Sequence, residues 1–215
     1  MDQAIVAGKS RGVGMGAHPS YPDLFGFGQN HIDVSDDQLQ SILLYQLGAL
    51  NAILKRHNQE LQHVKCHGAL YFDISQNEGT CRALLAAIDR IKPTPILVLP
   101  SGSKMVSLLR REGIPIAEEI AIDRGYDRSG EMLPRSHPDA LITDPKLVAD
   151  RLIRLLKGGV LRTGLVETAP VQAQTVCLHA DTPGATQIGS AVRRVLLMED
   201  IAVRPMAEII KNQHE

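Results

Sequence analysis

Ionisable side chains suited to proton transfer stand at the ends of four predicted strands. They are His18, His67, Asp123 with Arg124, and His179 with Asp181. In parallel α/β proteins, ligands collect at the carboxyl ends of the strands, because loops and helix N-termini converge there. An imidazole gives or takes a proton near neutral pH, and a carboxylate can orient that imidazole or hold a metal ion. The pattern therefore predicts one site, with catalytic roles for His18, Lys65, His67, Asp123, Arg124 and His179.

The stretch IDRGYDRSGEMLPRS, residues 122–136, combines arginines and carboxylates in a loop that follows a predicted strand. A guanidinium group suits a carboxylate or a phosphate, and a neighbouring carboxylate can hold it in place. Arg124 and Arg135 are therefore predicted to bind the cofactor, whereas Arg128 is expected to be exposed. The alternative is a solvated loop of alternating charge, which is the usual role of such runs.

Lys65 and His67 flank Cys66 in the stretch KCHGALY. Side chains alternate along a strand, so Lys65 and His67 are expected on one face and Cys66 on the other, in the core. Taken singly, a histidine such as His67 could equally be a hydrogen-bonded structural side chain.

The stretch PSYPDLFGFG, residues 19–28, follows His18 and has neither helical nor strand periodicity. Its prolines restrict the backbone, while Gly26 and Gly28 permit positive φ angles. Aperiodic loops of this length more often cover a site than merely connect elements, so we predict a shaped loop over the strand ends. The alternative is a surface loop without a function of its own.

Short apolar segments alternate with segments of helical period, which is the order of repeated βα units. The predicted strands are residues 12–19, 63–68, 95–100, 115–123 and 175–181. The predicted helices are residues 35–56, 77–93, 144–159 and 182–200. A capping box of Ser35 and Gln38 opens the first of these helices. Asp144 and Thr182 are the expected caps of the last two, and Gly158 is expected just past the end of the third.

This alternation predicts a single domain, residues 1–215, of the α/β class with a parallel sheet. Residues 1–12 are interpreted as the end of a helix that leads into the first visible strand. Because a parallel sheet normally opens with a strand, a first βα unit is expected to be missing.

The composition excludes several classes of partner. The formal net charge is -1, with 23 basic and 24 acidic residues, so no overall field attracts nucleic acid or an anionic membrane. Aromatic residues make up only 3% and Trp is absent, which argues against stacking of bases or sugars. Three cysteines without CxxC spacing favour the reducing cytoplasm over a disulfide framework. With no stretch that could span a membrane, a small-molecule substrate and protein partners are expected.

Four segments in this order carry a resemblance to a known family: GAHPSYPDLFGFG, VKCHGALY, IDRGYDRSGEMLPRSHPDALITDP and VCLHADTPGA. Together they resemble the LamB/YcsF family over nearly the whole chain, from about Ala4 to the final helix. The resemblance implies an irregular parallel βα barrel, similar to polysaccharide deacetylases, that lacks its first βα unit here. Relatives carry Asp, Asn and a Gly-Glu pair on a first strand, then an ACGFHAGD-like segment, and neither occurs in this sequence.

The resemblance also implies an activity, the ATP-coupled opening of 5-oxoproline to L-glutamate together with 5-oxoprolinase subunits B and C. ATP and Mg²⁺ are then the expected cofactors, with Lys65 and Arg124 around the transferred phosphoryl group. Asp123 or Asp181 would hold the metal ion through oxygen. The strand-end imidazoles would move the proton when the ring opens. Association of the chain with itself is open as well.

Two other functions remain open. One is a metal-dependent amide or ester hydrolase on the same barrel, in which strand-end imidazoles and Asp181 would hold a tightly bound transition metal. The other is a non-catalytic subunit, because the expected first βα unit is missing. ATP-independent turnover would favour the metal hydrolase, and turnover that survives His67→Ala would favour the non-catalytic role.

Overall fold

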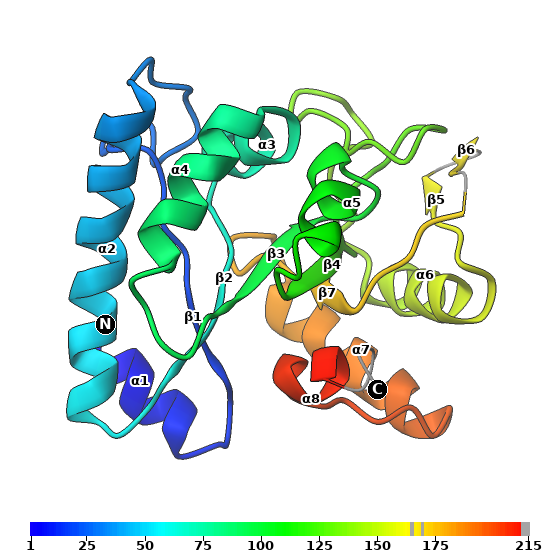
Figure 1. Ribbon diagram of the computed structural model, residues 1–215. Coiled ribbons are helices and arrows are strands. Elements are labelled where there is room, and N and C mark those ends of the chain that lie inside the picture. Colours follow the sequence, from blue (N-terminus) through cyan, green and yellow to red (C-terminus); the bar gives the residue numbers. More distant parts are fainter. Residues whose placement is uncertain (164–165, 169, 212–215) are drawn as a thin grey trace. The chain divides into compact units, whose positions relative to one another are not determined.

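Strands and helices alternate along the chain in the computed structural model, which describes residues 1–163, 166–168 and 170–211 (Figure 1). In this part of the chain the helices are α1 (Asp2–Lys9), α2 (Asp36–Arg56), α3 (Ala69–Gln76), α4 (Glu78–Ile88), α5 (Lys104–Arg111), α6 (Pro145–Gly158), α7 (Ala185–Met198) and α8 (Met206–Lys211). The strands are β1 (Met15–Ala17), β2 (Leu61–Val64), β3 (Ile96–Pro100), β4 (Ile116–Ala121), β5 (Arg162–Thr163), β6 (Val166–Glu167) and β7 (Thr175–Cys177). The chain forms two units, Met1–Ala117 with the segment from Pro205 onward, and Glu118–Arg204.

The first unit is built on the parallel strands β1, β2 and β3. Gly16 of β1 pairs with His63 of β2, and His63 in turn pairs with Ile96 of β3. Each of these strands leads into a helix or a loop before the next strand begins, as a parallel sheet requires. The predicted α/β class with parallel strands is therefore confirmed.

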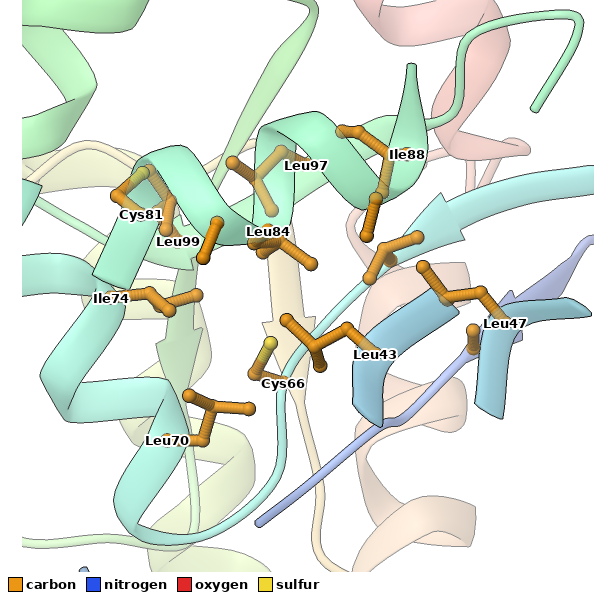
Figure 2. Packing of buried hydrophobic residues seen from close by; sticks show 14 of the residues in the cluster. Leu43, Leu47, Cys66, Leu70, Ile74, Cys81, Leu84, Ile88, Leu97 and Leu99 are labelled. Carbon is orange, nitrogen blue, oxygen red and sulfur yellow. The ribbon is translucent and has the colours of Figure 1, made fainter. Parts of the chain in front are cut away.

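Helices α2, α3, α4 and α5 enclose the core of the first unit with the strands, and α2 lies beside α4 (Figure 1). Figure 2 shows leucines of α2 and α4 meeting side chains of α3 and β3 around Cys66. Leu43, Leu84 and Leu97 are fully buried there. Each such leucine contributes about 1.5–3 kcal/mol by leaving water, so this cluster is the main source of stability in the unit. Cys66 is buried as predicted, and burial raises the pKa of its thiol.

The sequence explains why α2 is the longest helix. The Ser35 hydroxyl accepts from the Gln38 backbone N–H, and the Gln38 side chain accepts from the Ser35 N–H, so the predicted capping box is confirmed. Leu39, Leu43 and Leu47 then recur at helical spacing on the buried face.

The second unit contains the later residues of β4, paired in parallel with β7, and the antiparallel pair β5 and β6. Ile120 of β4 pairs with Val176 of β7. Helices α6 and α7 pack against each other, and Val148, Leu152 and Ile188 belong to the apolar cluster of this unit. Asp144 caps α6 and accepts from two backbone N–H groups of the first turn, as predicted.

Several boundaries differ from the sequence prediction. Gly158 is the last residue of α6 rather than the residue past its end, and Gly159 takes the left-handed position at φ 66°. Thr182 does not cap α7, because its hydroxyl donates to Asp123 and Gly184 precedes the helix instead. Helices α3 and α5 were not predicted. Each has only eight residues, which is too short for a clear helical period.

Among the described residues, no helix has the length and apolar content needed to cross a membrane.

Candidate functional site

His18 and His67 meet at the carboxyl ends of two neighbouring strands of the first unit. His18 directly follows β1, and His67 lies three residues beyond the end of β2. Backbone pairing continues past both strands, because the Lys65 N–H donates to the Ala17 carbonyl at 3.0 Å and the His67 N–H to the Pro19 carbonyl at 2.8 Å. The two imidazoles consequently stand edge to face with ring centroids 4.9 Å apart.

Hydrogen-bonding contacts connect the two rings to each other and to the backbone. His18 Nδ1 lies 2.7 Å from the Lys65 carbonyl oxygen, and His18 Nε2 lies 3.1 Å from His67 Nδ1. His67 Nε2 lies 2.7 Å from the Phe27 carbonyl oxygen. The Lys65 ammonium stands over the Tyr71 ring, 5.4 Å from its centroid, at a distance typical of cation–π contacts. The structure thus brings His18 and His67 together, and Lys65 contacts His18 through its backbone carbonyl.

The loop after His18 covers the end of β2. Its Gly28 carbonyl accepts from the Ala69 N–H at 3.0 Å, and a Cβ atom on Gly68 would lie 2.0 Å from that same carbonyl oxygen. Gly68 also has a φ of 60°, so glycine is required there on both counts. Phe27 has a φ of 54°, which is unusual outside glycine and turns its carbonyl toward His67.

Side chains of the loop itself hold its shape. Both carboxylate oxygens of Asp23 accept from later residues of the loop, at the N–H groups of Gly26 and Asn30. These hydrogen bonds, first that of Gly26, hold the pKa of the Asp23 carboxyl below its usual value. The Tyr21 hydroxyl donates to Asp73 of α3 at 2.7 Å and so ties the loop to that helix. The predicted shaped loop therefore lies over a strand end.

In the second unit, Asp123 and His179 form a hydrogen-bonded pair. Asp123 follows β4 and His179 follows β7, which is the parallel neighbour of β4. His179 Nδ1 lies 2.9 Å from Asp123 Oδ1, and the His179 backbone N–H donates to Asp123 Oδ2 at 3.1 Å. The Thr182 hydroxyl donates to the same Oδ2 at 2.6 Å. Thr182 is not among the predicted site residues, because the sequence pattern indicates a helix cap at this position.

The environment of Asp123 keeps it ionised. The side chain is fully buried, and burial opposes its negative charge. The hydrogen bonds from His179 and Thr182 outweigh that effect, so the pKa of Asp123 lies below its usual value. An ionised Asp123 can only accept, so Nδ1 of His179 carries a proton, and the neutral form of the ring then has its lone pair on Nε2. A neutral imidazole held this way can act as a general base, as in the Asp-His pairs of hydrolases.

Arg124 faces its own loop. Its Nε donates to the Ala140 carbonyl at 2.9 Å, and one terminal nitrogen donates to the Leu133 carbonyl at 2.7 Å. Burial lowers the pKa of the guanidinium group. These contacts give Arg124 the task of shaping the loop, and its predicted role with a cofactor remains a prediction.

Arg151 of α6 is a residue for which the sequence offered no signal. It is buried, and one terminal nitrogen donates to the carbonyls of Ile122 and Arg124, on either side of Asp123. Burial lowers the pKa of Arg151 to about 10, and the guanidinium group lies 5.6 Å from the centroid of the Tyr126 ring. Arg151 thus holds the backbone that carries Asp123.

The predicted magnesium ligands do not fit a metal site in the described residues. Both oxygens of Asp123 already accept hydrogen bonds, and Asp181 pairs with Arg135 at 3.4 Å. No three or more His, Cys, Asp or Glu side chains of the described ranges are grouped so that they could hold a metal ion.

The predicted site residues thus form two groups, one in each unit. His18, Lys65 and His67 gather in the first unit, and Asp123 and His179 gather in the second. The expectation that both groups open at one common mouth stays a prediction.

Comparisons with known proteins agree on one family. The profile described as the LamB/YcsF family matches residues 1–211. A protein of Thermococcus onnurineus, named as the A subunit of 5-oxoprolinase, is 38% identical over 211 residues, covering 98% of this chain and 83% of that protein. A protein of the same name from Fusobacterium nucleatum is 36% identical over 211 residues, covering 98% of this chain and 82% of its own length.

A solved structure agrees with these sequence comparisons. The crystal structure of a lactam utilization protein from Thermus thermophilus matches with a TM-score of 0.85 at 37% identity. The match covers 94% of this chain and 81% of that one. The chain therefore shares its fold with a protein that is named for lactam utilization.

Proposed function

Because the chain belongs to the LamB/YcsF family, we propose that it is the A subunit of a 5-oxoprolinase and opens the lactam of 5-oxoproline to L-glutamate. The names of the relatives supply the substrate class. The observation that carries a hydrolytic role is the buried Asp123 carboxylate paired with His179, because it gives the chain a positioned general base.

Opening a lactam with water requires two proton movements. Water forms a bond to the carbonyl carbon and gives up a proton, and the ring nitrogen gains a proton as its bond to that carbon breaks. Nε2 of His179 is the group that we assign to the first movement, because Asp123 holds the opposite nitrogen as a donor. A base placed in this way contributes about 10²–10⁴-fold to the rate.

The second proton movement requires an acid, and we assign it to the pair of His18 and His67. The two rings contact each other and stand beside the loop that follows His18. Lys65 adds a positive charge in the same unit, which suits the carboxylate of 5-oxoproline or the oxygen that becomes negative during attack.

We place the coupling to ATP in the assembled enzyme, formed with subunits B and C in the cytoplasm. Phosphorylation of the lactam oxygen by ATP would turn a poor electrophile into one that water attacks, and the phosphoryl group would then leave as inorganic phosphate. We further propose that Arg124 and Arg135 of this chain bind ATP. Titration of the purified chain with ATP, comparing Arg135→Ala with the unchanged protein, tests this binding directly.

The main test combines the purified chain with candidate subunits B and C, 5-oxoproline, ATP and Mg²⁺, and measures glutamate and ADP. We expect stoichiometric release of both products, and a loss of about 10²–10⁴-fold in His179→Gln. His137→Gln is the matched control, because His137 is exposed and contacts only its own loop in the described hydrogen bonds.

Three outcomes would contradict the proposal. Glutamate release without ATP that a chelator abolishes would support a metal hydrolase instead. Release that survives His179→Gln unchanged would assign the chain a non-catalytic role. Absence of glutamate from a stable complex of the three proteins would exclude 5-oxoproline as the substrate.

A further inference from the structure

A cavity of about 540 Å³ lies in the second unit, bordered by the segment 138–144, helix α6 and strand β5. Its volume is in the range of pockets that hold small molecules. Three arginines line it, Arg151 and Arg154 of α6 and Arg162 of β5. Ile142 and Leu147 add apolar surface to its wall. The lining therefore suits a small molecule that carries a negative charge and a short apolar part.

The guanidinium group of Arg151 offers this cavity two donor nitrogens. Its Nη1 donates to the carbonyls of Ile122 and Arg124, whereas Nε and Nη2 are buried and have no acceptor in the ranges that the structure describes. The N–H of Nε and one N–H of Nη2 point in the same direction from one edge of the planar group. That edge is a fork, which matches two oxygens of a carboxylate or a phosphate. Because buried donors without a partner are costly, an anion at this edge would stabilise the group.

The surroundings of Arg151 favour such an anion. The guanidinium carbon lies over the Tyr126 ring, 5.6 Å from its centroid, and this contact helps to hold the group in place. Burial lowers the pKa of Arg151 to about 10, so the group is still charged at neutral pH. The residue is only 2% exposed, and a charge shielded from water attracts an anion more strongly than a charge at the surface.

Three carboxylates also line the cavity and bear on its charge. Asp144 accepts from two backbone N–H groups in the first turn of α6, whereas Asp139 and Asp150 are exposed. Solvent screens the exposed carboxylates, so they repel an anion at Arg151 less than the buried guanidinium group attracts it. The same carboxylates suit an ammonium group on another part of the bound molecule.

We propose that this cavity binds a small molecule through an oxyanion, either a carboxylate or a phosphate, held by Nε and Nη2 of Arg151. Arg154 and Arg162 add positive charge at its border. The site uses none of the residues that the sequence pattern predicts for catalysis or cofactor binding. Because Nη1 of Arg151 holds the carbonyls on either side of Asp123, the bound anion and the segment that carries Asp123 contact the same side chain.

The test follows the Arg151 side chain while probes are added. The full chain, labelled with ¹⁵N in arginine, is titrated by NMR with inorganic phosphate, acetate or L-glutamate, at an ionic strength held constant with chloride. Arg151→Lys assigns the Nε–H signal, because it removes the fork and keeps the positive charge. We expect a saturable shift of this signal with at least one probe.

Calorimetry then measures the dissociation constant of the probe that binds. We expect it to rise about 10-fold or more in Arg151→Lys, which loses the fork, and about 5-fold in Arg154→Gln, which loses a charge at the border. Arg194→Gln on α7 is the matched control, because it removes an exposed arginine elsewhere in the same unit and should leave the constant unchanged. Arg154 is exposed, so Arg154→Gln tests the site even if Arg151→Lys does not fold.

The probes also distinguish the two kinds of oxyanion. Saturation with phosphate alone would identify a phosphate site, and saturation with acetate or L-glutamate a carboxylate site. An Arg151 signal that responds to none of the three would overturn the proposal and show that the fork binds water only. Equal weakening in Arg154→Gln and Arg194→Gln would also contradict it. The measurements need neither turnover nor partner subunits, so their failure would leave the proposed function unaffected.

Discussion

Asp123 and Arg124 are adjacent in the sequence but have different roles in the structure. Asp123 accepts hydrogen bonds from His179 and Thr182, whereas Arg124 donates to the carbonyls of its own loop. Their order along the chain predicts only that both follow a strand. The contacts decide that the carboxylate orients an imidazole and that the guanidinium group supports a loop.

Replacing Asp123 with Asn should impair catalysis more than folding. An amide can donate to Nδ1 of His179 and so favours the wrong tautomer, in which Nε2 carries the proton. In the corresponding Asp-to-Asn exchange of a serine protease the loss is about 10⁴-fold, and we expect about 10³–10⁴-fold in kcat here. The rate of glutamate formation measures it, with Asp150→Asn on the exposed face of α6 as the control. Equal rates in both variants would contradict the role of Asp123.

Asp123 should also make stability depend on pH. Its pKa is lower in the folded protein than in the unfolded chain, where it is about 3.9. The ionised carboxylate therefore stabilises the fold above about pH 4, and this contribution is lost as the pH falls through the folded pKa. Urea unfolding at several pH values should show a free-energy gap between the unchanged protein and Asp123→Asn that narrows on the acid side. A gap that is constant from about pH 6 to pH 3 would contradict the pKa shift.

Among the elements, the strands bring the ionisable residues together and the loop after β1 completes the first group. β1 and β2 are parallel neighbours, so residues that follow them meet at one edge. The loop adds the Phe27 carbonyl, which no motif indicates, because a backbone oxygen has no residue type. Side-chain motifs thus predict the imidazoles, while the group that orients one of them comes from the fold.

Removing the cap of α2 should weaken the first unit by a measurable amount. Ser35→Ala deletes the hydroxyl that accepts from the Gln38 N–H, and a lost cap of this kind costs about 1 kcal/mol. Ser41→Ala is the matched control, since its hydroxyl only donates back to the Asp37 carbonyl of the same helix. Urea unfolding should show a loss in Ser35→Ala alone. Equal free energies of unfolding for both variants would mean that the capping box adds nothing.

For the whole molecule, the described structure contains separate apolar clusters in its two units. The cluster around Leu43 belongs to the first unit and the cluster around Leu152 to the second. Strand β4 belongs to both, because it starts at Ile116 and the boundary lies after Ala117. Because β4 is one continuous strand with residues in both units, we propose that residues 1–215 form a single domain.

If the chain is a single domain, a substitution in either apolar cluster should destabilise both units together. Leu43→Ala and Leu152→Ala should each cost about 2–5 kcal/mol, because both side chains are nearly fully buried. Each substitution should shift one common unfolding transition. NMR signals of buried residues in both units measure that transition. Leu44→Ala and Leu156→Ala, at 41% and 45% exposure, are the matched controls. Two transitions that move independently would instead show two domains.

The sequence by itself determined the alternation of parallel strands and helices, the capped helix α2 and the placement of histidines after strands. These features are local, because they depend on side-chain periodicity and on hydrogen bonds between residues close in the chain. Family motifs added the substrate class.

Only the tertiary structure decided which of these residues touch. The contacts of His18 with His67 and of Asp123 with His179 join residues 49 and 56 positions apart, and no local pattern encodes such distances. It also turned Thr182 from an expected cap into a donor to Asp123, and it placed the guanidinium group of Arg124 against carbonyls of its own loop. The physical reason is that a side chain with several available partners takes the one that the packed fold places beside it.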